Sequence, residues 1–322
     1  MKVLVTGGAG YIGSHACKAL VRSGHQPIIY DNLQRGHRSL VRWGTLEVGD
    51  LGDAARLREV MLRHRPDGII HFGAFTYVGE SIKDPALYYR NNVLGSVSLL
   101  DAMRVHGPNL IVFSSSCATY GPPRAVPITE DHPQSPINPY GASKLMVERM
   151  LQDYGAAYGL RWMSLRYFNA AGADPEGEVG ELHDPETHAV PLAILAALGR
   201  VASFQVYGTD YPTPDGSAVR DYVHVADLAS AHVAALVHLS KGGDSMAVNL
   251  GTGVGTSVLD LLDAVGRVAG RPVPVARCAR RVGDADVLVA DARRAGEVLG
   301  WRPRYTDIND IVATAWDWHR SR

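Results

Sequence analysis

The chain has 322 residues, enough for one large domain or two modest ones, and its 46% hydrophobic and 20% charged residues are ordinary for a globular protein. A formal net charge of -1 argues against binding to nucleic acid or to an acidic membrane. The cysteines, Cys17, Cys117 and Cys278, are far apart, which favours a reducing compartment over a disulfide framework and indicates no metal centre. No apolar run matches a signal peptide or a membrane span, so we expect a cytoplasmic enzyme with no membrane partner.

Short apolar segments alternate with helical segments along the first half of the chain. Strands are predicted over residues 3–5, 27–31, 46–50, 68–72, 110–113 and 161–167. Helices are predicted from residue 11 and over 54–63, 84–105 and 140–158. This alternation predicts an α/β fold with a doubly wound, Rossmann-type parallel sheet. Ligands of such sheets bind beyond the carboxyl ends of the strands, so we expect Asp31, Gly73 and Ser116 to face one crevice.

The composition changes from about Ala170, where proline and glycine become frequent and strands are harder to assign. Helical patterns recur over residues 189–199, 226–240, 258–269 and 307–320. We therefore predict a dinucleotide-binding part over residues 1–169 and a smaller α/β C-terminal part over residues 170–322 that holds the substrate. The two are expected to interleave, because residues 247–250 have the pattern of a strand that returns to the first sheet.

A glycine-rich turn follows the first strand and opens the first helix. Gly7, Gly10 and Gly13 have G-x-x-G-x-x-G spacing, and with Gly8 in place of Gly7 the spacing is G-x-G-x-x-G. Glycines permit the tight turn and let the backbone approach a pyrophosphate, whose charge the helix N-terminus attracts. This context of strand, glycine turn and helix predicts dinucleotide binding.

An acidic residue ends the second predicted strand. Asp31 stands 18 residues after Gly13, where it can accept hydrogen bonds from an adenosine ribose. A carboxylate there repels a 2′-phosphate, so NAD is favoured over NADP. Arg35, which is close by in the sequence, argues instead for NADP.

Three polar residues offer proton-transfer chemistry. Pro139 suits the first turn of a helix, which places Tyr140 and Lys144 one turn apart on one face. A nearby ammonium favours the phenolate, which makes Tyr140 a candidate proton acceptor for a hydroxyl group; the alternative is a helix surface pair. Ser116 ends a predicted strand and can hydrogen-bond a developing carbonyl oxygen, or it only satisfies the backbone there.

The set of glycine turn, Ser116, Tyr140 and Lys144 resembles the extended short-chain dehydrogenase/reductases. Four further stretches, at residues 166–169, 208–216, 220–225 and 281–284, resemble the UDP-glucose 4-epimerases, and the likeness runs over essentially the whole chain. That resemblance implies an NAD-dependent isomerase of galactose metabolism that interconverts UDP-galactose and UDP-glucose. In such a reaction Tyr140 takes the 4-hydroxyl proton, C4 gives a hydride to nicotinamide, and the 4-keto sugar turns over before the hydride returns. Lys144 is then also expected to reach the nicotinamide ribose.

The resemblance also implies individual contacts. Those implied for NAD, beyond Tyr140, Lys144 and the glycines, are Tyr11, Ile12, Asp31, Asn32, Asp50, Leu51, Phe72, Gly73, Asn91 and Phe168. Those implied for the UDP-sugar, beyond Ser116 and Tyr140, are Asn169, His188, Tyr207, Arg220, Arg281, Asp284 and Leu288. For Asp50 a helix cap is the alternative, for Arg220 an ion pair with Asp221, and for Tyr207 a core aromatic.

Three positions depart from the family pattern. Thr76 stands where a lysine contacts NAD, so one cationic contact is missing. His188 stands where an asparagine lies near the sugar. Leu288 stands where some members carry a pocket-restricting tyrosine, so a 2-acetamido sugar, UDP-N-acetylglucosamine or UDP-N-acetylgalactosamine, is expected to fit as well.

Rival functions remain on the same scaffold. A nucleotide-sugar 4,6-dehydratase usually needs an Asp-Glu pair just after the position of Ser115, where this chain has Ser116 and Cys117. Epimerases of UDP-pentoses or UDP-uronates stay open, and so does a non-catalytic NAD-binding sensor, although such proteins generally lose the Tyr-Lys pair. The resemblance also implies a homodimer that pairs the helices over 84–105 and 140–158. The alternative is that their apolar residues all face the protein's own sheet.

Overall fold

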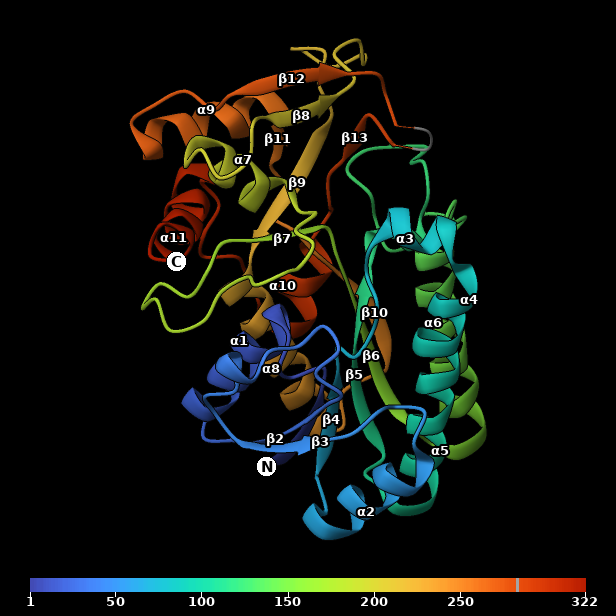
Figure 1. Ribbon diagram of the computed structural model, residues 1–322. Coiled ribbons are helices and arrows are strands. Elements are labelled where there is room, and N and C mark those ends of the chain that lie inside the picture. The colour runs from blue at the N-terminus through green and yellow to red at the C-terminus, as the bar shows by residue number, and fades with distance from the viewer. Residues whose placement is uncertain (282–283) are drawn as a thin grey trace.

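The computed structural model describes residues 1–281 and 284–322; Val282 and Gly283, in the motif at 281–284, lie outside the described residues. Figure 1 shows a large sheet with helices on both faces and, above it, a smaller part built from the second half of the chain. Within the described residues, every helix is too short or too polar to cross a membrane.

The large sheet has seven parallel strands in the order β10-β6-β5-β4-β1-β2-β3. The strands are β1 (Lys2–Thr6), β2 (Gln26–Asp31), β3 (Thr45–Val48), β4 (Gly68–His71), β5 (Leu110–Ser116), β6 (Arg161–Tyr167) and β10 (Met246–Leu250). The strand order reverses direction between β1 and β4, and the ligand crevice of such sheets lies at that point. The predicted Rossmann-type fold is confirmed.

Both faces of the sheet are buried, because side chains alternate along each strand. Val3 and Val5 pack with α1 (Tyr11–Arg22) and α8 (Val225–Ser240), and Leu4 packs on the opposite face with α2 (Ala54–His64), α5 (Gly95–His106) and α6 (Pro139–Tyr158). A 3₁₀ turn, η1 (Arg38–Leu40), connects β2 to β3, and another, η3 (Cys117–Thr119), follows β5.

The helix predicted over 84–105 is interrupted. After α3 (Val78–Lys83), the chain forms α4 (Pro85–Tyr88), a π-helical stretch η2 (Tyr89–Leu94), and then α5. Within η2 the buried Asn92 bonds both backbone groups of Phe75, accepting from its N–H at 2.8 Å and donating to its carbonyl at 3.0 Å, and also donates to Ser143 Oγ at 3.0 Å. These bonds anchor the loop after β4 to α6.

The smaller part contains short sheets and its own core. A four-stranded sheet joins β7 (Asn169–Ala171), β9 (Val219–His224), β11 (Gly255–Ser257) and β13 (Val287–Leu288), and β8 (Phe204–Tyr207) pairs with β12 (Val275–Cys278). Its helices are α7 (Ala189–Ala197), α9 (Val258–Ala269) and α11 (Ile308–Arg320), whereas α10 (Arg293–Leu299) packs against β10 and α8 of the large sheet. The return strand expected at 247–250 is present as β10, beside β6. The division at residue 170 stays a prediction.

Candidate active site

The glycine turn lies against the loop that follows β4. Gly7 has φ +70°, and a Cβ on it would lie 2.7 Å from the amide nitrogen of Gly73. A Cβ on Gly13 would collide with the carbonyl oxygen of Gly7. The N-cap of α1 is Gly10, which brings no side chain to the first-turn N–H groups, so these groups are suited to an anionic ligand. Tyr11 and Ile12 are the first two residues of this helix.

Asp31 is held at the end of β2 beside the same turn. Its Oδ2 accepts from the Ala9 N–H at 3.0 Å and its Oδ1 from the Leu33 N–H at 2.8 Å. Burial raises the pKa of Asp31, while these two bonds favour its charged form. Arg35 is engaged elsewhere, because it pairs with Glu80 at 2.6 Å and lies over the Tyr77 ring. Arg35, the residue that argued for NADP, is therefore directed at Glu80.

The other residues expected around NAD gather at this edge of the sheet. Asn32 Nδ2 donates to Asp50 Oδ2 at 2.7 Å, so Asp50 bonds Asn32 and the Gly52 N–H, while Asp53 caps α2. Leu51 packs close to Gly73, where an added Cβ would lie 2.9 Å from its Cδ1. Phe72 and Gly73 follow β4, Thr76 is exposed beyond them, and Asn91 donates to Asn92 Oδ1 at 2.9 Å.

Tyr140, Lys144 and Ser116 are brought together by α6 and the end of β5. Asn138 caps α6, with Pro139 in its first turn. Lys144 Nζ donates to the Ser114 carbonyl at 2.8 Å and lies 5.9 Å from the centroid of the Tyr140 ring. Ser116 Oγ accepts from the Ala118 N–H at 3.2 Å, which leaves its own proton for a further acceptor. All three side chains are buried.

The pKa values in this site differ from the sequence expectation. Burial raises the pKa of Tyr140, against the lowering expected from Lys144, although the Ser116 hydroxyl opposes the rise. Burial also lowers the pKa of Lys144 to about 7, against the pull of Glu148. Both shifts disfavour the charged form in a desolvated pocket, so ionising Tyr140 requires a positive charge brought close to it.

A buried ion pair behind the site was not anticipated from the sequence. Arg166 in β6 donates to Glu148 Oε2 in α6 at 2.6 Å, and Ser115 Oγ donates to Glu148 Oε1 at 2.5 Å. Both charges are almost fully buried, and together they tie α6 to β5 and β6. The only indication of this ion pair in the sequence was the position of Glu148, one turn after Lys144 on the same helix face.

A second group of expected residues adjoins Ser116. Tyr167 pairs with Ser116, and the next residue, Phe168, belongs to a small apolar cluster that Leu288 and Cys117 flank. Leu288 in turn pairs with Arg220 on β9. Arg220 Nη1 donates to the Val219 carbonyl at 2.8 Å rather than pairing with its neighbour.

The neighbour, Asp221, is directed into the protein. It accepts hydrogen bonds from Thr252, Gly253 and Ala290. Asn169 lies in β7 opposite Tyr222, two residues along β9 from Arg220. The backbone thus places Asn169, Arg220 and Leu288 around one strand.

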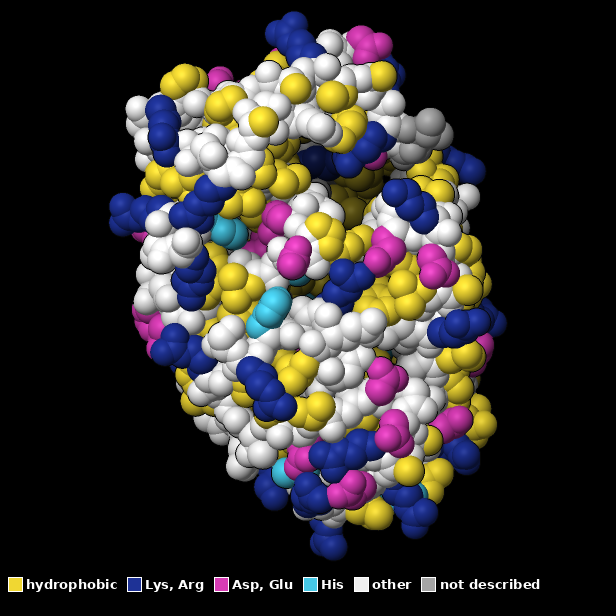
Figure 2. Space-filling view, viewed as in Figure 1, with side chains coloured by type: hydrophobic (Ala, Val, Ile, Leu, Met, Phe, Trp, Pro, Cys, Tyr) yellow, Lys and Arg dark blue, Asp and Glu magenta, His cyan; other side chains and the backbone are white. Residues whose placement is uncertain are grey.

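A third group lies at the ends of β8 and β12. The Arg281 guanidinium lies 4.6 Å from the Tyr207 ring centroid and pairs with Asp284 at 2.9 Å. An aromatic face, a guanidinium and a carboxylate suit a base, a phosphate and a ribose hydroxyl respectively. Figure 2 shows a hollow between this smaller part and the rest of the molecule, with basic and hydrophobic side chains at its rim.

The segment between β7 and α7 crosses the N-terminus of α1. Tyr11 donates its hydroxyl proton to the Gly172 carbonyl at 2.5 Å. His188, the residue before α7, bonds the buried Glu181, and His183 lies 2.9 Å from the same carboxylate oxygen. Burial opposes ionisation of Glu181, yet His188 and His183 lower its pKa to about 2.

A dinucleotide crevice flanked by a buried tyrosine, lysine and serine defines a nicotinamide-dependent enzyme of the short-chain dehydrogenase/reductase class. Residues 3–251 match the model of the NAD dependent epimerase/dehydratase family. The chain belongs to this family.

The relatives are similar over their full lengths. A UDP-glucose 4-epimerase of Rhizobium meliloti is 57% identical over 99% of this chain and 97% of its own. The UDP-glucose 4-epimerase of Brucella ovis, solved in complex with NAD, is 56% identical with a TM-score of 0.96, covering 98% and 97% of the two chains. The UDP-Glc/GlcNAc 4-epimerase of Campylobacter jejuni is 36% identical with a TM-score of 0.87, covering 100% and 99%.

Proposed function

We propose that this protein is a UDP-glucose 4-epimerase that interconverts UDP-galactose and UDP-glucose through a transient 4-keto sugar. The observation that carries the proposal is the convergence of Tyr140, Lys144 and Ser116 at the end of β5, on the same carboxyl edge of the sheet as the glycine turn, where ligands bind. Relatives with this name cover almost the whole chain.

The crevice fits NAD. The close approach of Gly7 and Gly73 and the side-chain-free cap at Gly10 leave backbone N–H groups for a pyrophosphate. Asp31, fixed by two backbone bonds, accepts from the adenosine ribose, Lys144 reaches the nicotinamide ribose, and Asn91 and Phe168 are further NAD contacts. When bound, NAD supplies the hydride acceptor and a positive charge at its ring.

The protein's own groups then move one proton and hold the sugar. Tyr140 accepts the proton of the 4-hydroxyl, because a cation beside the phenol stabilises the phenolate that burial alone disfavours. Ser116 donates its free proton to the 4-oxygen as carbonyl character develops there. Inverting C4 requires that the 4-keto sugar turn over and present its other face before Tyr140 returns the proton to the 4-oxygen, while Arg220, Arg281 and Asn169 hold the diphosphate.

The deciding experiment incubates purified protein with UDP-galactose, UDP-N-acetylgalactosamine, a UDP-pentose and a UDP-uronate without added NAD, and analyses the products for C4 epimers. We expect conversion of UDP-galactose to UDP-glucose with no net consumption of NAD. Conversion restricted to the pentose or the uronate would assign the pocket to that sugar instead. Adding UDP-sugar should also raise absorbance near ~340 nm at least transiently, and a non-catalytic sensor would give no such change.

We extend the proposal to 2-acetamido sugars because of the residue at position 288, Leu288. Leu288 packs beside Phe168 and Cys117, next to the end of β5 that carries Ser116. A leucine there leaves more room than a tyrosine. We therefore include UDP-N-acetylglucosamine and UDP-N-acetylgalactosamine in the proposed substrate range.

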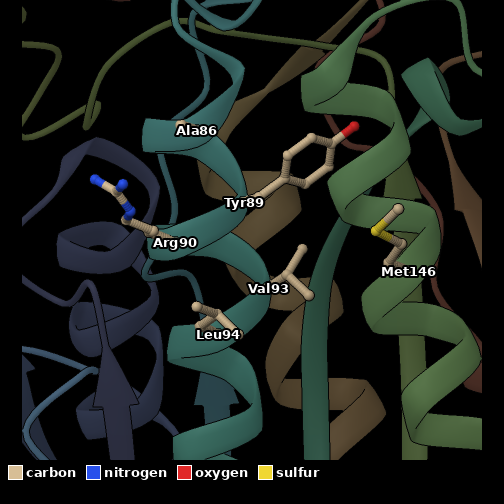
Figure 3. Close-up of a pocket in the computed structure, with 6 residues that line it drawn as sticks. All are labelled: Ala86, Tyr89, Arg90, Val93, Leu94 and Met146. Carbon is tan, nitrogen blue, oxygen red and sulfur yellow. The ribbon is translucent and has the colours of Figure 1, made fainter.

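We also propose a homodimer in the cytoplasm, the location that three free cysteines favour. The proposed dimer face runs along α4, η2 and α6; Figure 3 shows a hollow there, lined by Ala86, Tyr89, Arg90, Val93, Leu94 and Met146. Leu94 is 59% exposed and Met146 45%, whereas Leu99 and Leu100 are buried against the sheet. Some apolar residues of this helical run therefore pack on the protein's own sheet, and others are exposed on the opposite side. The exposed ones are suited to packing against a second copy of the chain.

A further inference from the structure

We propose that Glu181, His183, Glu186 and His188 form a binding site for one divalent transition-metal ion of the Zn²⁺ type. One ligand atom from each residue can be chosen so that all four lie within 4.8 Å of one another. Two imidazoles and two carboxylates are a donor set that Zn²⁺ accepts. The cluster contains none of Tyr140, Lys144 and Ser116, although the family resemblance also implies His188 for the sugar, and no step of the proposed epimerisation uses a metal.

The spacing suits a single ion. Ligands about 2.0–2.2 Å from a tetrahedral metal are about 3.3–3.6 Å from one another. His183 Nδ1 lies 2.9 Å from Glu181 Oε1 and 3.9 Å from Glu186 Oε1, on either side of that value. His188 Nδ1 contacts the same Glu181 oxygen. All four atoms lie within 4.8 Å of one another.

A second observation concerns the lone pair of His183. Its Nδ1 is buried and has no hydrogen bond of acceptable geometry within the described residues, although a carboxylate oxygen lies 2.9 Å away. A nitrogen in that position is satisfied by an ion placed between it and its neighbours. The charges also balance, since two carboxylates and two neutral imidazoles around Zn²⁺ leave no net charge beside the buried Glu181, in a place that His188 leaves partly exposed.

The surrounding structure orients the ligands in advance. The Trp318 indole donates to the Glu181 carbonyl at 2.8 Å, and Glu186 Oε1 accepts from the Thr187 and His188 N–H groups at 2.7 and 2.9 Å. The His183 ring stands edge-on to Tyr11 and Tyr77. A closed four-ligand site here would pin the segment between β7 and α7 across the start of α1.

A neighbouring acidic cluster differs from the Glu181 cluster in already holding a cationic side chain. Asp174, Glu176 and Glu178 also lie close together, but Lys18 Nζ sits among them at 2.6, 3.0 and 2.6 Å. That cluster already contains its cation. The Glu181 cluster has no lysine or arginine contact of this kind among the ion pairs of the described residues, so its basic partners are His183 and His188, the imidazoles that a metal ion would take as ligands.

The test measures metal content and affinity of the tag-free full chain. After exposure to Zn²⁺ and dialysis, we expect one zinc per chain and a higher melting temperature, and with Co²⁺ the intense visible bands of four-coordinate cobalt. His183→Gln and Glu186→Gln should each weaken zinc binding at least about tenfold, because each removes one of four ligands. Glu178→Gln, the same chemical change in the same segment, should bind as the unaltered protein does.

Two results would overturn the proposal. One is an unaltered protein that retains no zinc and shows only six-coordinate cobalt, a result that does not depend on any variant folding. The other is zinc binding by both variants with unchanged affinity, which would place the ion at other histidines. If one variant loses its NAD or its helical circular dichroism, the other variant decides.

Discussion

At the scale of single residues, the proposed chemistry depends on the protonation state of Tyr140. Burial raises its pKa, and Lys144, whose own pKa burial lowers to about 7, lies near the ring rather than bonded to the hydroxyl. A lysine one turn away is therefore insufficient by itself to ionise the phenol in this structure. The nicotinamide charge and the substrate hydroxyl must complete the site.

Replacing the phenol tests that assignment. Tyr140→Phe keeps the ring and its packing with Phe75 and Tyr88 but removes the proton acceptor. We expect turnover to fall by about 10²–10⁴-fold, the usual worth of a positioned general base, while NAD stays bound. Initial rates with UDP-galactose and the NAD content of denatured protein measure the two effects. Near-normal turnover would move the base elsewhere.

The proposed role of Leu288 in setting the width of the sugar pocket is also tested at the scale of one residue. Leu288→Tyr adds a ring beside Phe168 and Cys117, so we expect activity on UDP-N-acetylgalactosamine to fall at least about tenfold while activity on UDP-galactose changes little. Leu288→Met, which conserves volume, is the control. An equal loss on both sugars would show that Leu288 does not discriminate the 2-substituent.

The sequence predicted site residues well where they belong to a short local motif. The glycine spacing, Asp31 and the Tyr140–Lys144 pair are short-range patterns, and the structure brings each set to the same edge of the sheet. The Glu181 cluster and the Arg166–Glu148 pair were not identified from the sequence. Arg166 and Glu148 are 18 positions apart on different elements. The four residues of the Glu181 cluster follow the pattern Glu-x-His-x-x-Glu-x-His. Their ligand atoms come together only because this irregular segment folds back on itself, which the sequence pattern does not predict.

At the scale of elements, the helical run from 85 to 106 shows where periodicity misleads. Its apolar pattern predicts one helix, but the structure inserts the π-helical η2 between α4 and α5. A π turn adds a residue without adding a distinctive composition, so a 3.6-residue pattern cannot reveal it. The gain is Asn92, turned inward to bond Phe75 and Ser143, the residue next to Lys144.

The opposite side of this run carries the proposed dimer face. Leu94→Glu places a charge at a 59% exposed position in the lined hollow, so we expect a shift from dimer to monomer with little loss of fold. Size-exclusion chromatography with light scattering measures the mass. Leu62→Glu, at a 48% exposed position on α2 away from this face, is the control and should leave the mass unchanged. A monomeric unaltered protein would remove the dimer proposal.

At the scale of the whole molecule, the fold was the most predictable property. Parallel strands covered on both faces are nearly continuous apolar runs, and the intervening helices have lengths that local patterns reveal. The small sheets of the second part were not predictable in this way. Strands such as β11 and β13 have three and two residues, too short to carry a period, and their pairing depends on contacts distant in sequence.

Buried histidines make the whole fold sensitive to acid. Burial lowers the pKa of His232 to about 4, and the charge of Lys144 adds to the effect; His15, His71 and His224 are lowered to about 4, 3 and 3 for the same main reason. In the unfolded chain each ring takes up a proton near pH 6.5. These groups therefore contribute stability above pH 6.5, and it is lost as the pH falls toward 4 and below.

His232 allows one contribution to be isolated. Its ring packs 4.6 Å from Phe72, its Nδ1 donates to the Leu228 carbonyl, and its Nε2 is buried with no partner among the described residues. His232→Phe keeps a ring but cannot take up a proton, so the free energy of unfolding should fall less steeply between pH 6.5 and 4. The slope should decrease by up to about 1.36 kcal/mol per pH unit, the value for one proton.

Urea unfolding at each pH measures that slope, and His106→Phe, at the partly exposed end of α5, is the matched change. The comparison uses slopes rather than stabilities because the lost Leu228 bond costs the same at every pH, whereas the proton is taken up only in acid. An unchanged slope in His232→Phe would mean that this ring is already charged in the folded protein, so acid lability would have to arise from the other buried rings.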